Sequence, residues 1–98
     1  MIADDLDYAA LAQLSGLVVA AGYDAGTCYA EISNDGGATK AAFGDGSTRK
    51  EIAPMAEEQP SIEVTTAGEL VVALTYAGQV RGYVSRDWGE HWSGLDIA

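Results

Sequence analysis

The sequence predicts an all-β protein of antiparallel sheets. Short apolar, β-branched runs are separated by glycine-containing turns, which is the pattern of strands and hairpins. Two segments of the chain also repeat the same order of strand, turn, strand and tight turn. The 98 residues, 48% of them apolar, are enough for one small core, so we expect a single module over residues 1–98.

The first copy begins with a segment that two structures would suit. Residues 4–14 are rich in alanine and leucine behind an aspartate, as in a short capped helix, whereas the repeat favours a strand. Residues 17–20, Leu-Val-Val-Ala, are continuously apolar, which is typical of a strand covered on both faces. Residues 24–27 contain the glycine that a hairpin turn favours. The next strand alternates, with Glu31 on the side opposite to its apolar neighbours.

The second copy repeats this order. Residues 61–66 alternate and are rich in β-branched side chains, so they predict its first strand. Residues 70–73, Leu-Val-Val-Ala, repeat the apolar run, and residues 76–79 again hold a glycine for the turn. Tyr83 takes the place of the alternating polar position in the strand that follows.

The spacing of the copies is that of propeller blades. Leu17 and Leu70 are 53 positions apart and Ser33 and Ser85 are 52 apart, and we assign the one-residue slip to the turn between these landmarks. A repeat of about 40 to 50 residues is typical of four-stranded blades. The sequence therefore predicts two propeller-like blades of about four strands each, with an unrelated small β sandwich that has two Asp-Gly-type hairpins as the alternative.

These landmarks divide the chain into three parts. We expect repeat one at about 6–43 and repeat two at about 61–98. The stretch 44–60, with its glycines and two prolines, predicts a loop-rich link between them.

Each copy ends in the same short motif. The two motifs are Ser33-x-Asp35-x-Gly37-x-Thr39 and Ser85-x-Asp87-x-Gly89-x-x-Trp92. In such a turn the aspartate accepts backbone N–H groups, the glycine takes a left-handed backbone and the serine hydroxyl closes the other side. A tryptophan on the next strand can cover the turn.

These motifs resemble the Asp box, S-x-D-x-G-x-T-W, of the sialidase-like (BNR) repeat proteins. The first has Lys40 where the tryptophan is usual, and the second has His91 where the threonine is usual. The resemblance implies a structural turn between the third and fourth strands of a blade, away from the usual active centre.

Catalysis is not what this sequence predicts. Sialidases of the resembling family need an arginine triad, a tyrosine nucleophile paired with a glutamate, and an acidic residue near an R-I-P motif. The chain has three arginines, Arg49, Arg81 and Arg86, but no R-I-P; residues 51–54 read Glu-Ile-Ala-Pro. We therefore predict no enzyme, with a fragment of a sialidase-like glycosidase as the remaining catalytic alternative.

Charge and composition exclude several further classes. Five basic and fifteen acidic residues give a net charge of −10, which disfavours nucleic acid. Cys28, expected to be buried, and His91 are single, so no disulfide, zinc site or other cofactor is predicted. The acidic runs 4–7 and 57–58 are interpreted as solvated charge, with weak calcium binding as the alternative.

No membrane span is predicted, because the longest apolar run, 17–21, is far shorter than the roughly 20 residues that cross a bilayer. The acidic start lacks the basic residues of a secretory signal, so we expect synthesis in the cytoplasm.

Two blades cannot close a propeller, so something must cover their outer faces. We expect a homo-oligomer, docking into a larger assembly, or a longer repeat protein. The predicted function is a non-catalytic structural or assembly module. By analogy with the resembling family, the setting is a phage virion or tail and release is within the virion; the alternative is a lectin-like carbohydrate-binding oligomer. Trp88, Tyr83 and Arg86 are the candidate ligand or interface residues.

Overall fold

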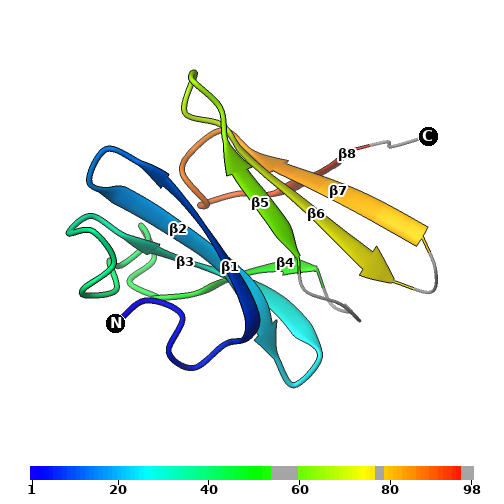
Figure 1. Cartoon of the computed structure of the whole chain (residues 1–98), viewed down its shortest axis with the longest axis horizontal. Helices are drawn as coiled ribbons and strands as arrows, with labels where there is room; N and C mark the ends of the chain where they lie inside the picture. Colours follow the sequence, from blue (N-terminus) through cyan, green and yellow to red (C-terminus); the bar gives the residue numbers. More distant parts are fainter. Residues whose placement is uncertain (54–59, 77–78, 96–98) are drawn as a thin grey trace.

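The computed structural model describes residues 1–53, 60–76 and 79–95, and these form two four-stranded antiparallel sheets without a helix (Figure 1). Neighbouring strands in the chain are neighbours in each sheet. The first sheet contains β1 (Asp7–Leu14), β2 (Leu17–Asp24), β3 (Thr27–Ser33) and β4 (Lys50–Ala53). The second contains β5 (Ser61–Val64), β6 (Leu70–Tyr76), β7 (Gln79–Ser85) and β8 (Ser93–Leu95). The predicted all-β class is confirmed.

The hydrogen-bond register shows which residues of the two sheets are equivalent. Val18 lies opposite Ser33 in the first sheet, and Leu70 lies opposite Ser85 in the second. Equivalent residues of the two sheets are therefore 52 positions apart in the sequence at both members of these pairs. This offset stays 52 along both hairpins, because Asp24 pairs with Thr27 in the first and the equivalent Tyr76 pairs with Gln79 in the second. Leu70 corresponds to Val18, not to Leu17.

The one-residue slip lies in an earlier turn than the sequence suggested. Gln13 lies opposite Val18, and Val64 lies opposite the equivalent Leu70, so the first strands are offset by 51. The turn between β1 and β2 has two residues, Ser15 and Gly16, whereas Thr65 bonds to Glu69 across the three residues 66–68. Placing the slip in the later turn was wrong, because matching leucines by residue type paired positions on opposite faces.

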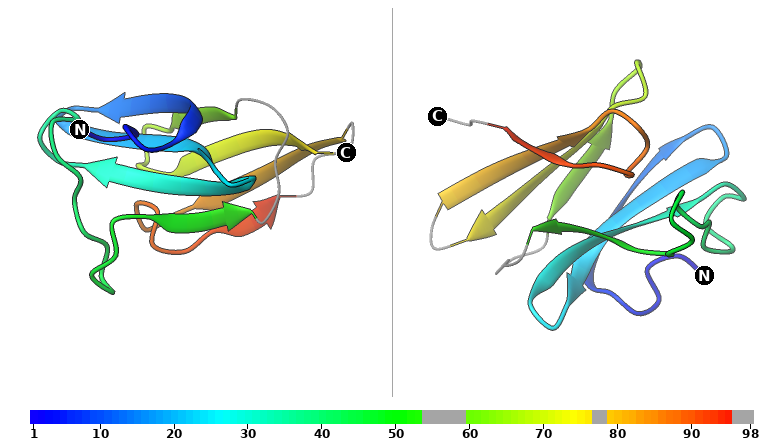
Figure 2. Two further views of the ribbon diagram at one scale, coloured as in Figure 1. Left: turned by 90° about the horizontal axis from the view of Figure 1, so that it is seen from below. Right: turned by 180° about the vertical axis from the view of Figure 1, so that it is seen from behind.

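The two sheets stack face to face. The core lies between them, and β1 and β5 are side by side (Figure 2). Val19 of the first sheet points into this core, whereas its equivalent Val71 points away from it. We call the face that contains Val19 or Val71 the front and the opposite face the back. The front of the first sheet thus packs on the back of the second, which contributes Ile62, Leu70, Val72 and Leu74.

Strand β1 lies within residues 4–14, for which the sequence allowed either a helix or a strand. Ala10 and Ala12 point towards the core, and their small size lets β1 lie close to β5. The predicted two-sided burial holds for β2, where residues 18–23 are all buried. In β6 only alternate residues are buried, because no described segment covers the front of the second sheet to the same extent.

The fourth strands of the two sheets differ because the first sheet has an inserted loop, residues 42–49, which we call the excursion. Ala41 forms a bridge to Ile32, as the equivalent Ser93 pairs with Val84, but the first sheet then needs residues 42–49 before β4 begins. The stretch 44–60, expected to be a loop-rich link, therefore contains a strand; residues 54–59 lie outside the described part. The excursion joins the sheets. Phe43, 3% exposed, enters the core, and its ring lies 3.1 Å from where a Cβ on Gly89 would stand.

Candidate functional site

The first Asp turn follows β3 and is closed by its own side chains. The Ser33 hydroxyl donates to Asp35 Oδ1 (2.6 Å) and accepts the Gly37 N–H (2.9 Å). Asp35 also accepts the backbone N–H of Thr39 (3.0 Å) and its hydroxyl. Gly37 has φ +99°, which favours glycine. The donors from Ser33 and Thr39 hold the pKa of Asp35 well below its usual range.

The second Asp turn follows β7 and has the same bonds. The Ser85 hydroxyl donates to Asp87 (2.8 Å) and accepts the Gly89 N–H (2.8 Å), and Asp87 accepts the His91 N–H (2.9 Å). The imidazole of His91 replaces the threonine hydroxyl, with Nδ1 2.5 Å from Asp87 Oδ2. Partial desolvation acts to raise the pKa of Asp87, but the bonds from His91 and Ser85 lower it to about 2.

Both turns connect the third and fourth strands of their sheets. Ser33 and Ser85 are each 1% exposed, and both aspartates lie at the surface with their oxygens directed back into the turn. Each carboxylate therefore satisfies backbone N–H groups that would otherwise lack a partner. The chemistry of both motifs is conformational: they hold the shape of the turn that follows the third strand.

The tryptophans after Asp87 are half-buried and pack against the core. The indole of Trp92 donates to the Gly89 carbonyl (3.0 Å), so it covers the turn. Trp88, a candidate ligand or interface residue, has φ +57° at the position that Gly36 fills in the first turn with φ +75°. A side chain at positive φ is strained, and packing against the core offsets that cost.

The remaining two interface candidates do not form one site with Trp88. Tyr83 lies on the back of the second sheet, half-buried against the core. Arg86 is exposed and pairs with Glu69 (2.7 Å). The three predicted residues are thus distributed over the packed back face, the turn and the surface.

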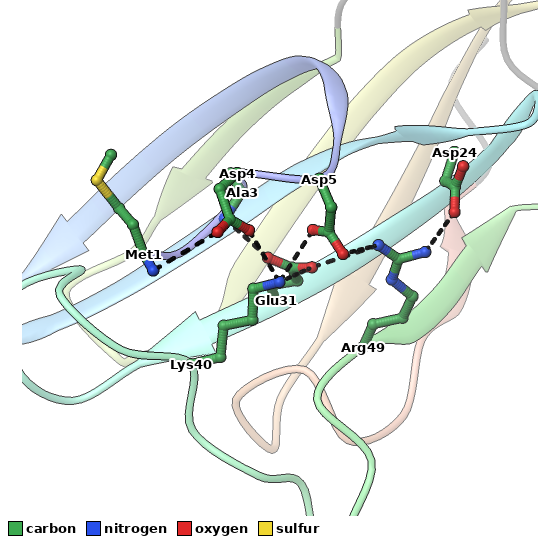
Figure 3. Close-up of polar contacts among 8 residues, drawn as sticks. All are labelled: Met1, Ala3, Asp4, Asp5, Asp24, Glu31, Lys40 and Arg49. Atoms are coloured by element: carbon green, nitrogen blue, oxygen red, sulfur yellow. Dashed lines mark hydrogen bonds and ion pairs between the residues drawn. The ribbon is translucent and has the colours of Figure 1, made fainter.

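A charge cluster that the sequence did not predict lies on the back of the first sheet (Figure 3). At its centre is Glu31 of β3, whose side chain is 1% exposed. Its Oε1 accepts the backbone N–H of Ala3 (2.7 Å), while Oε2 has no hydrogen bond. Burial raises the pKa of Glu31, and the neighbouring Asp5 acts in the same direction.

Two cations bridge this carboxyl to the acidic N-terminal segment. Lys40 lies 3.0 Å from both Asp4 and Asp5, and 3.5 Å from Glu31. Arg49 pairs with Asp5 at 2.7 Å and lies 3.6 Å from Glu31. Its other nitrogen pairs with Asp24, also at 2.7 Å. Asp4 and Asp5, interpreted from the sequence as solvated charge, are half-exposed and ion-paired, and Lys40 lowers the pKa of both.

The cluster holds residues 1–6 across the back of the first sheet. Ile2 packs on Val18 and Ala20, and its N–H bonds to the Gly37 carbonyl (3.1 Å). Gly22 gives room for this crossing, because a Cβ there would lie 2.9 Å from that of Leu6. The N-terminal segment therefore acts as a cap on this face, which we call the N-terminal cap.

Among the described residues, no segment covers the front of the second sheet as fully as the second sheet covers the front of the first. Val19, Ala21 and Cys28 are 0% exposed and Tyr23 is 5% exposed in the first sheet. Their equivalents Val71, Ala73 and Thr75 are half-buried, and Val80 is 56% exposed. We call Val71, Ala73, Thr75 and Val80 the open patch. Two further front positions, Gly82 and Val84, are buried, as are their equivalents Ala30 and Ile32.

The rest of the described chain offers little reactive chemistry. Within residues 1–53, 60–76 and 79–95 no three side chains of the metal-binding types come together as a metal site. Cys28 is buried, which raises the pKa of its thiol to about 12. The described residues contain no helix of the length and hydrophobicity needed to cross a membrane.

Comparison with protein-family models, curated proteins and solved structures found no match to this chain. The assignment of its class therefore depends on the geometry of the two sheets and their turns.

Proposed function

We propose that the chain is a non-catalytic structural module of the sialidase-like Asp-box type, whose two sheets act as successive propeller-like blades in a larger assembly. The open patch carries the proposal. Its four positions are equivalent to positions that sheet packing buries within the same chain. Incompletely buried apolar side chains on a sheet face, here Val71, Ala73 and the exposed Val80, are typical of a surface that another element covers.

The two turns support the blade interpretation. Both have a serine, an aspartate and a glycine in the same hydrogen-bonded arrangement, and both precede a fourth strand. The stacking of front on back also agrees, because blades of a propeller follow one another in one sense. The phage virion or tail setting depends on the resemblance of the motifs alone.

The catalytic and lectin-like alternatives receive less support. A sialidase needs convergent arginines, whereas Arg49 pairs with Asp5 and Asp24, and Arg86 pairs with Glu69. A sugar platform needs an exposed aromatic face. Of the aromatic candidates, Tyr83, Trp88 and Trp92 are half-buried against the core.

Sedimentation velocity over a wide concentration range tests this assembly role. We expect the unchanged chain to associate and Val80→Lys to remain monomeric, because burying an unpaired charge is costly. Leu11→Lys is the matched control: Leu11 is 59% exposed, but lies on the back of the first sheet, so its association should be unchanged. Identical monomeric behaviour of all three chains at every concentration would contradict the proposed function.

A further inference from the structure

We propose that the open patch binds the open patch of a second copy of this chain, giving a two-fold symmetric dimer of second sheets. This inference rests on the assembly role proposed above and names its partner. It has three supports: the type of surface, the closed opposite end and the distribution of charge.

The side chains of the open patch indicate that its partner is the face of a β-sheet. In the first sheet the positions equivalent to Val71 and Ala73 are Val19 and Ala21, and a sheet face covers both completely. The open patch keeps small and β-branched side chains at these positions, as flat sheet packing requires. A sheet face from another molecule would therefore complete the burial that the first sheet already has.

The N-terminal cap excludes the other arrangement of copies. Repeating the internal packing would place the open patch of one copy on the back of the first sheet of the next. That back is occupied by residues 1–6, and beneath them lies Glu31 with Lys40 and Arg49 beside it. An apolar sheet placed there would remove these charges from their partners in the cap, which is strongly unfavourable. The sheet face left for a second copy is the open patch itself.

The distribution of charge favours the same contact. Among the described side chains that β5–β8 direct to the front, Glu63 alone is charged, and it lies on the edge strand β5. The cap at the other end of the molecule carries Asp4 and Asp5. A dimer through the open patch keeps these acidic ends apart, which matters for a chain of net charge −10. Two-fold contacts are also the commonest among soluble homo-oligomers.

Single cysteines can distinguish the symmetry of the contact. Cys28 is buried and its pKa is raised to about 12, so an introduced surface thiol is the reactive one. We would prepare Val80→Cys, Ala73→Cys and, as a control on the capped back face, Leu11→Cys. Each would be treated with a flexible bis-maleimide, alone and in pairwise mixtures, while sedimentation velocity measures the mass of the unchanged chain.

The proposal expects a mass of two chains for the unchanged protein. Val80→Cys and Ala73→Cys should each cross-link to themselves, and Leu11→Cys should not. Val80→Lys should weaken association about tenfold or more, as expected for a lysine from each chain placed in the contact.

Two outcomes would overturn the dimer and separate it from the proposed function. If Val80→Cys cross-links only in mixtures with Leu11→Cys, or the mass exceeds two chains, the contact is front to back; the two-fold inference then fails while the assembly role stands. If no variant cross-links and Val80→Lys has no effect on mass at any concentration, both proposals fail.

Discussion

The first and second sheets of this protein pair their strands in equivalent register and have the same Asp turn after the third strand. They differ in what covers their faces. The first is buried on its front by the second sheet and capped on its back by residues 1–6. The second is buried on its back by the first sheet, and its front has Gly82 and Val84 buried but retains the open patch. Equivalent backbone therefore does not determine equivalent exposure, which depends on the neighbour that each sheet finds.

A substitution in the shared core should have the largest effect. Leu70 is 0% exposed between the sheets, whereas its equivalent Val18 lies under the short cap and is 6% exposed. Leu70→Ala should cost about 2–5 kcal/mol in urea unfolding, because it leaves a cavity between two rigid sheets. Val18→Ala should cost roughly 1–2 kcal/mol, since fewer carbon atoms are lost and the cavity beneath the cap is smaller. Equal losses would show that the cap packs as firmly as a sheet.

Substitution of the equivalent valines sharpens the comparison of the two fronts. Val19 is fully buried and Val71 is half-buried. Val19→Ala should cost roughly 2–3 kcal/mol, from two lost carbon atoms and the cavity left behind. Val71→Ala should cost less than about 1 kcal/mol in dilute solution. Thermal unfolding at low protein concentration measures both, and similar values would contradict the open front of the second sheet.

The two Asp turns should respond alike. Asp35→Ala and Asp87→Ala should each cost about 1–3 kcal/mol, because each leaves turn donors without an acceptor. The imidazole of His91 in place of the Thr39 hydroxyl should change this little, since both substitutions remove an acceptor from the same backbone position. Chemical denaturation of both variants is the measurement. A substitution without effect on unfolding would show that its turn does not depend on the carboxylate.

The smallest effects should be those of pH, and they should have opposite signs for Glu31 of the first sheet and Asp87 of the second. The pKa of Glu31 is raised, so its contribution to stability is present in acid and is lost as pH rises through the folded value. The pKa of Asp87 is lowered from 3.8 to about 2, so its contribution is present above pH ~4 and is lost as pH falls towards 2.

Unfolding free energies across this pH range test the signs with two isosteric variants. The unfolding free energy of the unchanged chain, relative to that of Glu31→Gln, should fall as pH rises from about 4 to neutrality. The unfolding free energy of the unchanged chain, relative to that of Asp87→Asn, should fall as pH falls below about 4. The same sign for both would contradict the buried state of Glu31.

Apart from β4, which lies in the stretch expected to be a loop, the strands and turns could be predicted because their signals are local. Apolar alternation, the glycine at position 26 and the Ser-x-Asp-x-Gly spacing each act within a few residues. The strand at 7–14 followed from the repeat, although its alanines and leucines alone also suit a helix.

The register, the excursion and the charge cluster could not be predicted, because they depend on contacts between distant segments. The equivalence of Val18 with Leu70 is set by pairing with the third strand, not by residue type. Phe43 lies at the end of the expected first repeat, directly before the stretch expected to be a loop, and nothing local indicated that it enters the core. Glu31 alternated like a solvent-exposed residue, and nothing near it in sequence indicated that Lys40 and Arg49 would meet it beneath Asp5.

Solvent paramagnetic relaxation of the valine methyl groups, measured in dilute and concentrated solution, tests the central claim most directly. We predict that Val19 is protected at both concentrations, whereas Val71 and Val80 are strongly relaxed in dilute solution and become protected as the dimer forms. Protection of Val71 equal to that of Val19 in dilute solution would contradict the claim that two equivalent sheets differ by one open face.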